Sequence, residues 1–201
     1  MRYGMVIDLK RCAGCNSCTV ACRAEKATPR GILYHRVEKY EAGKYPVARM
    51  KFRPMPCMHC EQPACLEVCP TGATYRRDDG IVLVDHNKCM GCRYCVLAWP
   101  YEARHYMKRI DNYYGMAGRT PFEIMKQKDL DKGTAVKCDF CVERLDRGRL
   151  PACVETCPAQ ARYFGDLDDA KSEVSELIAV NRGVVLREEL GTKPSVYYIN
   201  G

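Results

Sequence analysis

The sequence predicts an α+β fold of short strands, short helices and long loops, arranged as two small halves within 201 residues. Three observations support this fold class. The chain has 15 cysteines, which fall into four groups separated by long cysteine-free stretches. Only 9% of the residues are aromatic, so we expect something other than large side chains to fill the interior. The apolar runs between the groups are short, and none reaches the roughly 18 residues of a membrane-spanning helix.

The four cysteine groups repeat one spacing. Each group ends four residues after its third cysteine, at a position that is cysteine in groups one, two and four and Trp99 in group three. Proline follows that position in groups two, three and four. A fourfold internal repeat of this kind is the strongest signal in the sequence. In chain order the groups are Cys12-x2-Cys15-x2-Cys18-x3-Cys22, Cys57-x2-Cys60-x4-Cys65-x3-Cys69, Cys89-x2-Cys92-x2-Cys95-x3-Trp99 and Cys138-x2-Cys141-x11-Cys153-x3-Cys157.

This spacing distinguishes among three uses of cysteine. A disulfide framework suits small secreted chains with an even number of cysteines, whereas this chain has 15 and shows no secretory leader. Structural zinc needs only paired C-x2-C units with four ligands per ion. The spacing C-x2-C-x2-C-x3-C is typical of bacterial ferredoxins, in which the fourth cysteine reaches a second cluster. The sequence therefore predicts iron–sulfur clusters held by two interlocked pairs of groups.

Trp99 is the one departure from this ligand pattern. An indole offers only an N–H donor and cannot bind iron. We therefore expect one cluster to be held by three thiolates, with the Trp99 ring filling the fourth corner.

The net charge has two interpretations. The formal value of +7 comes from 32 Lys and Arg against 25 Asp and Glu, a balance that suits nucleic acid or an anionic membrane as a partner. Ligating cysteines are thiolates, however, and each oxidised cluster with its thiolates carries about −2, which brings four clusters and the chain close to neutral. We expect the basic excess to offset buried cluster charge and expect no nucleic-acid binding.

Secondary structure is expected in short segments around the groups. Strands are placed where apolar residues alternate, and helices where a group is followed by an apolar period near 3.6 or by an acidic start such as Asp168-Asp169. Residues 109–135 are polar with little periodicity and are expected to be a connecting loop, either a solvated surface loop or a partner-docking arm. In chain order we expect a strand at 3–8, a helix at 15–25, a strand at 46–53, a hairpin of 73–77 and 80–85 that turns at Asp78-Asp79, strands at 103–108 and 161–164, a helix at 167–181, and strands at 184–187 and 196–200.

Several motifs around the cysteines also resemble a known family. They are IDLKRC at 7–12, CMHCEQPAC at 57–65, DHNKCMGC at 85–92, KCDFC at 137–141, PACVETCP at 151–158, GDL at 165–167 and YYI at 197–199. With them, residues 3–105 and 136–199 resemble the four-cluster iron–sulfur (beta) subunits of molybdopterin oxidoreductases of the polysulfide, thiosulfate and dimethyl sulfoxide reductase type.

The resemblance implies which groups share clusters. Group one would pair with group four and group two with group three, so that two bacterial-ferredoxin-like (2×[4Fe-4S]) halves are nested. Residues 46–108 would form a half inserted into the one made by 1–45 and 136–201, with 109–135 connecting them. The implied ligand sets are Cys12, Cys15, Cys18 and Cys157 for site I; Cys138, Cys141, Cys153 and Cys22 for site II; Cys89, Cys92, Cys95 and Cys69 for site III; and Cys57, Cys60 and Cys65, with Trp99 replacing the fourth ligand, for site IV.

The expected cofactors follow from these sets. Sites I to III are expected to hold three [4Fe-4S] clusters, and three thiolates beside an indole make a [3Fe-4S] cluster, of high potential, the expected occupant of site IV. Two alternatives remain open. Site IV could hold a four-iron cluster with water, hydroxide or another side chain such as His59 on the fourth iron, or it could be empty and packed by Trp99.

The implied function is electron transfer without catalysis. The residues show no nucleophile–base pair, phosphate loop or flavin motif. The resemblance implies an electron-transfer protein that connects a molybdopterin (Mo or W) catalytic subunit to a membrane quinone/quinol subunit or another carrier. It implies membrane association through partners and a periplasmic location by co-export, with a cytoplasmic one left open. A free-standing polyferredoxin, or a cluster subunit of a hydrogenase or formate dehydrogenase, is the alternative.

Overall fold

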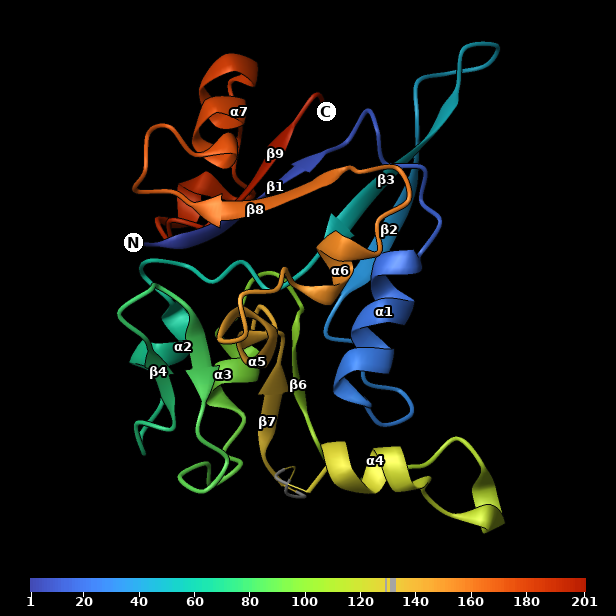
Figure 1. Cartoon of the computed structure of the whole chain (residues 1–201), viewed down its shortest axis with the longest axis vertical. Coiled ribbons are helices and arrows are strands. Elements are labelled where there is room, and N and C mark those ends of the chain that lie inside the picture. Colours follow the sequence, from blue (N-terminus) through green and yellow to red (C-terminus); the bar gives the residue numbers. More distant parts are fainter. Residues whose placement is uncertain (129, 131–132) are drawn as a thin grey trace.

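A three-stranded sheet joins the two ends of the chain in the computed structural model, which describes residues 1–128, 130 and 133–201 (Figure 1). The strand order is β8–β1–β9. β1 (Tyr3–Asp8) pairs antiparallel with β8 (Arg162–Asp166) and parallel with β9 (Val196–Ile199). The strand that precedes group one is therefore hydrogen-bonded to the strand that follows group four.

The central strand β1 is buried on both faces because its side chains alternate between two packing layers. Val6 packs with Val174 of α7 (Glu173–Asn181), whereas Met5 and Ile7 belong to the main core. All three of these β1 side chains are fully buried. In Figure 1, α7 covers one face of the sheet and the cysteine-bearing loops lie on the other.

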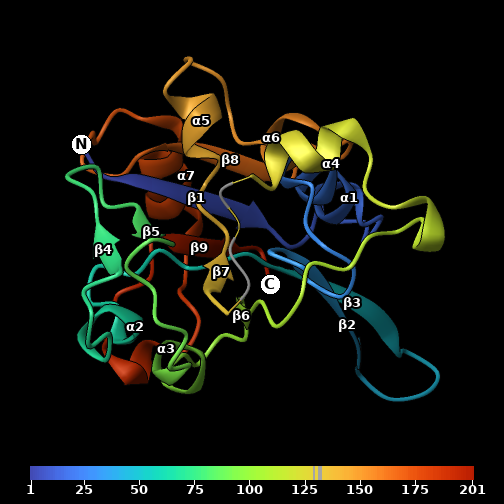
Figure 2. The same cartoon turned by 90° about the horizontal axis from the view of Figure 1, so that it is seen from below.

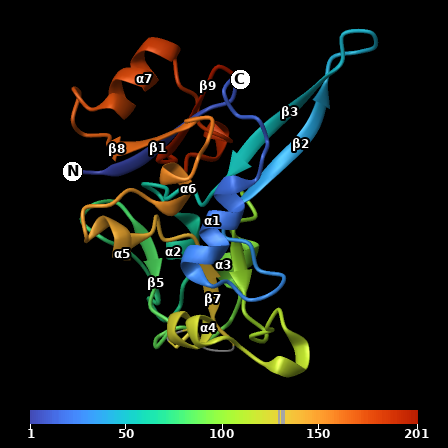
Figure 3. The ribbon, with the colours of Figure 1, turned by 45° about the vertical axis from the view of Figure 1, so that its right-hand side comes forward.

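The remaining strands form two-stranded antiparallel ladders, each of which joins the strand after one cysteine group to the strand before the next. Figure 3 shows the first ladder projecting as a hairpin from the body of the molecule. The ladders are β2 (Arg36–Ala42) with β3 (Arg49–Met55), β4 (Thr74–Arg76) with β5 (Val82–Val84), and β6 (Arg104–Tyr106) with β7 (Ala135–Lys137).

Each cysteine group has a short helix that carries its third cysteine. α1 packs against α6, and α2 packs against α3, so group one lies beside group four and group two beside group three. α5 (Val142–Leu145) lies between the two halves of group four. The cysteine-bearing helices are α1 (Ser17–Lys26), α2 (Ala64–Glu67), α3 (Tyr94–Leu97) and α6 (Ala152–Glu155).

Residues 109–135 contain more structure than the expected loop. They include a 3₁₀ turn (Gly115–Ala117) and α4 (Pro121–Lys126). Thr120 and Glu123 form a capping box, which explains why a helix starts here without an apolar period. Gln127 at the end of α4 donates from Nε2 to the carbonyl oxygen of Ala27 at 2.5 Å, which ties α4 to the end of α1 (Figure 2). The loop prediction is wrong for α4, and 129 and 131–132 lie outside the described residues.

Most other expected elements are confirmed within a few residues. The strand at 3–8 matches β1 at both ends, and the helix at 15–25 matches α1 within two residues. β4, β5, β6, β8 and β9 lie at or within two residues of their predicted positions. The strand expected at 46–53 is shifted to β3, because the turn of the hairpin, closed by Val47 N–H to the Lys44 carbonyl at 2.8 Å, occupies its first residues.

Two expectations near the C-terminus need correction. The helix expected at 167–181 starts only at Glu173, because Asp166 and Asp169 hold the preceding backbone in side-chain turns and Ser172 is the N-cap. The strand expected at 184–187 is wrong, since only Val184 forms a bridge, with Tyr198. Arg187 has φ +50°, which breaks an extended run ahead of a 3₁₀ turn (Glu188–Leu190).

One continuous core runs through both expected halves and includes many of the cysteines. The ladder β2–β3 crosses the expected boundary at residue 45, and β6–β7 joins 46–108 to 136–201. The two halves therefore share strands and packing. Within the described part of the chain, no helix is both long enough and apolar enough to cross a bilayer.

Candidate metal centres

All 15 cysteines are among the described residues, and each has a free thiol. The disulfide alternative is therefore excluded. Two of the expected thiol sets line cavities near the surface, and the thiols of the other two expected sets are buried in the interior.

Site I is a small, partly open cavity. Gly14 (φ +66°) makes the turn between the first two cysteines of group one, and a side chain there would collide with the ring of Phe52. The N–H of Ala161 donates to Cys157 Sγ at 3.4 Å. Group four thus supplies one wall of a cavity that group one encloses. The thiols that line it belong to Cys12, Cys15, Cys18 and Cys157.

Site III repeats this construction with groups three and two. Its cavity is also small and partly open, and Gly91 (φ +73°) makes the equivalent turn against the Gly133 carbonyl. Backbone N–H groups of Thr74 and Ala135 donate to two of its sulfurs, each at 3.4 Å. Amide donors of this kind orient a ligating thiolate and stabilise its charge. The thiols that line this cavity belong to Cys69, Cys89, Cys92 and Cys95.

Site II lies in the interior, where group one meets group four. Burial raises the pKa of Cys22 well above its ordinary value, and the charges of Cys153 and Cys141 add to the effect. Burial also raises the pKa of Cys141 to about 12. Burial also raises the pKa of Cys138 strongly, and the charge of Cys22 adds to this effect. Cys22 therefore lies close enough to each of the three group-four thiols to interact with it.

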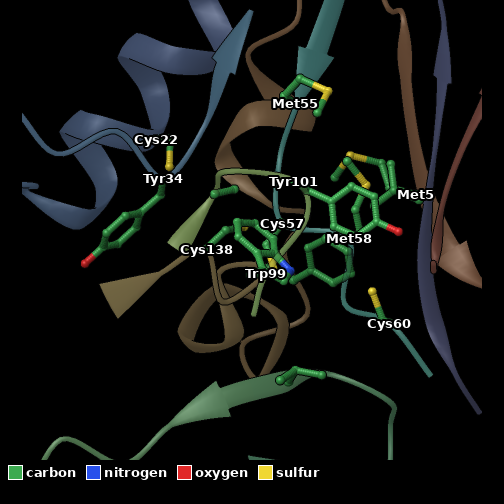
Figure 4. Packing of buried hydrophobic residues seen from close by; sticks show 14 of the residues in the cluster. Met5, Cys22, Tyr34, Met55, Cys57, Met58, Cys60, Trp99, Tyr101 and Cys138 are labelled. Carbon is green, nitrogen blue, oxygen red and sulfur yellow. The ribbon is translucent and has the colours of Figure 1, made fainter. Parts of the chain in front are cut away.

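Site IV is the interior counterpart in groups two and three. Cys57, Cys60 and Cys65 are all buried, and burial followed by the charge of Cys57 raises the pKa of Cys60 to about 12. Trp99 is buried in the same core, with its ring edge-to-face on Tyr101 at 5.8 Å between centroids. Figure 4 shows Trp99 and Cys57 together at the centre of this packing. The indole therefore occupies space in the same core as these three thiols.

The interior donor sets fit a multivalent iron cofactor. A thiolate is the form that binds metal, yet burial alone opposes ionisation of the Cys60 and Cys141 thiols, which lie far from bulk water. A bound cation reverses that balance and deprotonates a coordinating thiol. Buried thiols of this kind are thus a suitable host for clusters and a poor host for isolated thiolate charge.

His59, the alternative fourth ligand, is held at its Nδ1 and its ring face, and its buried Nε2 has no hydrogen-bond partner among the described residues. Its ring stacks on Phe140 at 3.7 Å between centroids, and its Nδ1 accepts a hydrogen bond from the N–H of Val82 at 3.1 Å. Burial, then the charges of Lys137 and Arg104, hold the pKa of this imidazole well below its ordinary value, so it is neutral. These contacts give His59 a packing role between the two halves.

The sequence interpretation overlooked a polar contact beside site IV. The Tyr101 hydroxyl lies 2.7 Å from Thr192 Oγ1 and donates to the Leu186 carbonyl at 3.2 Å. The Thr192 hydroxyl also hydrogen-bonds the Cys60 sulfur and lowers its pKa against the larger effect of burial. No local pattern signals this contact, because Thr192 comes from the C-terminal segment far from groups two and three.

Buried cations were also overlooked. Arg104, Lys137 and Arg162 are only 4%, 7% and 5% exposed. The two arginines have a signal in the sequence, which is a repeat: Arg104 follows Trp99 by five residues in WPYEAR, and Arg162 follows Cys157 by five residues in CPAQAR. The charged side chain thus recurs at one position after groups three and four.

Comparisons with known proteins agree with this geometry. Two sequence families described as 4Fe-4S dicluster domains match the chain, one at residues 48–115 and 106–167 and the other at 11–73. Together the matched segments contain all four cysteine groups. The iron–sulfur interpretation of the spacing is therefore confirmed, and structural zinc is set aside.

The chain is also similar along nearly its whole length to curated proteins. It is 46% identical over 215 residues to the B subunit of selenate reductase from Mesobacillus selenatarsenatis, covering 99% of this chain and 72% of that protein. It is 44% identical to a putative iron–sulfur B subunit of dimethyl sulfoxide reductase from Halobacterium salinarum, with coverages of 99% and 79%. It is 37% identical to the arsenate respiratory reductase iron–sulfur subunit of a Shewanella species, with coverages of 99% and 96%.

Proposed function

Because the chain belongs to the family of iron–sulfur B subunits of reductase complexes, we propose that it carries electrons through four clusters between a molybdopterin catalytic subunit and a membrane quinone subunit or another carrier. Members of this family are electron-transfer subunits and not the catalytic ones. Clusters bound in sites I to IV would supply one-electron redox centres.

The proposed ligand sets are those of sites I to IV. The observation that carries them is that group-spanning sets of thiols line single cavities: Cys157 of group four joins the group-one cavity, and Cys69 of group two joins the group-three cavity. The packing of α1 on α6 and of α2 on α3 supports the same pairing, and with it the nested halves. Backbone donors to Cys157 and Cys69 sulfurs support a ligating role for both.

Site IV is proposed to hold a [3Fe-4S] cluster and sites I to III [4Fe-4S] clusters. Trp99 is buried in the same core as the three thiols, and its indole supplies no lone pair for iron. His59, the nearest alternative ligand in sequence, is engaged with Val82 and Phe140. Both observations support three thiolates and a space-filling ring.

The order of the sites supports a relay with two accessible ends. The charges of Cys18 and Cys153 interact, linking sites I and II. Those of Cys138 and Cys57 link II to IV, and those of Cys65 and Cys95 link IV to III. The thiols of sites II and IV are all buried, whereas those of sites I and III include exposed or partly exposed ones such as Cys15. Electrons would enter and leave at the two outer sites.

The arm formed by residues 109–135 is proposed to dock a partner subunit near site I. It exposes Tyr114, Met116 and Phe122, and its tyrosines lie beside Val20 and Arg23 of α1, the helix that carries Cys18. Exposed apolar side chains next to one of the two outer sites suit a protein contact. The complex is proposed to reach the membrane through its partners, on the periplasmic side, with a cytoplasmic location as the alternative.

The decisive experiment is anaerobic purification of the native complex. We expect about 15 iron atoms per chain, from three four-iron clusters and one three-iron cluster, together with co-elution of a large molybdopterin subunit. Absence of iron would overturn the proposal. Elution of the iron-loaded chain alone would favour the polyferredoxin alternative, and a hydrogenase or formate dehydrogenase large subunit would favour the other alternative. Replacing the exposed Tyr114, Met116 and Phe122 by serine leaves the site III residues Gly133 and Ala135 in place and should abolish co-elution, and unchanged assembly would overturn the docking role.

A further inference from the structure

The buried cations Arg104, Lys137 and Arg162 need an energetic explanation. Burying a cationic side chain is costly unless anionic groups and hydrogen bonds compensate it. The leading anionic neighbours of both arginines are cysteine sulfurs, not carboxylates. Each cation therefore has its charge placed among the proposed cluster ligands.

Arg162 lies at the junction of sites I and II. Its Nη1 donates to Cys153 Sγ of site II at 3.4 Å, and the residue also lines the cavity of site I. Its charge acts on Cys153 first and then on Cys18 of site I. The guanidinium is fixed there by Met5 Sδ at 3.3 Å and by a contact with His35 Nε2.

Arg104 lies at the junction of sites III and IV. Its charge acts on Cys65 and Cys57 of site IV and on Cys95 of site III. Nη1 donates to Thr74 Oγ1 at 2.8 Å and the side chain also hydrogen-bonds the Cys95 sulfur, but Nε and Nη2, although buried, have no hydrogen-bond partner among the described residues. Unpaired buried donors are rare and costly. Sulfur atoms of a bound cluster are the acceptors that would satisfy them.

Lys137 lies at the remaining junction, between sites II and IV. Its Nζ donates to the Cys138 carbonyl at 2.6 Å and to the carbonyl of Val82. Its charge lowers the pKa of Cys138 in site II and of Cys65 in site IV, in each case against the larger effect of burial. The two sites belong to different halves, so Lys137 spans the boundary between them.

We propose that Arg162, Lys137 and Arg104 are charge bridges, one at each junction along the order I–II–IV–III, which raise the reduction potentials of the two clusters that each one flanks. The proposal rests on the proposed function, because it requires clusters in all four sites. Each cluster with its thiolates carries about −2 when oxidised, and reduction of one cluster opposes reduction of the next. A fixed cation between two such charges favours the reduced state of both.

The test replaces each cation by methionine, which has a similar unbranched stem and no charge. Midpoint potentials of all four clusters are measured by EPR-monitored redox titration of the full-length chain in its complex. Arg162→Met should lower the potentials at sites I and II, Arg104→Met those at III and IV, and Lys137→Met those at II and IV. The matched controls Arg162→Lys, Arg104→Lys and Lys137→Arg keep the charge and should keep potentials close to wild type.

The outcomes separate charge from packing. Unchanged potentials in iron-loaded methionine variants overturn the charge bridge. Loss of iron from the methionine and charge-retaining variants alike also overturns it, because the shape of the side chain would then be what matters. Loss of iron in the methionine variant alone supports it. A wild-type chain without clusters would instead refute the proposed function, before any variant is compared.

Discussion

Cys22 and Trp99 hold the same position in two repeats, and the comparison separates what the fold provides from what one residue provides. Each follows the third cysteine of its group by four residues, and each is buried, at 7% and 8% exposure. Cys22 faces three thiols of group four, and Trp99 packs in the core with three thiols of group two. The repeat thus places a buried side chain in the interior at this position, and the residue type decides whether that side chain is a fourth thiolate.

The chain beyond these two residues also differs. Arg23 follows Cys22, so α1 continues to Lys26, whose Nζ pairs with Asp139 at 2.7 Å. Pro100 follows Trp99, and α3 has already ended at Leu97. Proline cannot continue the helical hydrogen bonding, so this segment turns toward Tyr101 and the C-terminal segment instead. Site II is therefore braced by a helix and an ion pair, and site IV by aromatic packing and a hydroxyl contact.

The largest expected effect comes from removing one thiolate from each interior site. Cys60→Ala should leave site IV with two thiolates and lose its whole cluster, about three of roughly 15 iron atoms. The matched variant Cys141→Ala should leave site II with three thiolates and lose only about one iron. Iron and acid-labile sulfide per chain measure both. Equal losses in the two variants would show that the sites do not differ in ligand number.

The next effect comes from making the two positions alike. Trp99→Cys supplies the missing thiolate, so site IV should gain about one iron, lose the EPR signal of an oxidised three-iron cluster and shift to lower potential. Trp99→Phe keeps an aromatic ring without a ligand and should retain the three-iron signal. A wild-type chain with no such signal, or a Trp99→Cys variant that keeps it, would contradict the assignment of site IV.

The sequence was most informative where covalent spacing dictates geometry. Cysteines three residues apart must lie on one tight loop, so the group structure, the helix after group one and the strand before it were predictable from local residues. The hairpin strand β2 was overlooked because its ladder projects from the body, so neither face carries a clear apolar alternation. α4 was overlooked because its capping box, and not its periodicity, starts it.

The polar interior was less accessible to sequence reasoning. Thr192 reaches Tyr101 across 91 residues, and His59 reaches the Val82 N–H across 23, so neither contact has a local signature. The buried arginines differ, because the repeat WPYEAR and CPAQAR placed both of them in register. Comparing residues outside the cysteines between the repeats would have singled them out.

The smallest expected effect concerns the hydroxyl contact that braces site IV. Tyr101→Phe removes the hydroxyl that contacts Thr192 and Leu186, and should lower the local free energy of opening by about 1 kcal/mol. Hydrogen exchange of the segment around Thr192, in the iron-loaded chain, measures it. Tyr45→Phe is the matched control, because Tyr45 is 94% exposed and should change nothing.

A double-mutant cycle shows whether this contact acts as one unit. Thr192→Val removes the other hydroxyl of the pair, so the double variant should lose less than the sum of the two single variants. Full additivity would mean that Tyr101 acts through Leu186 alone and Thr192 through Cys60 alone. In that case the brace is two separate hydrogen bonds, and site IV, like site II, is held by independent contacts from different segments.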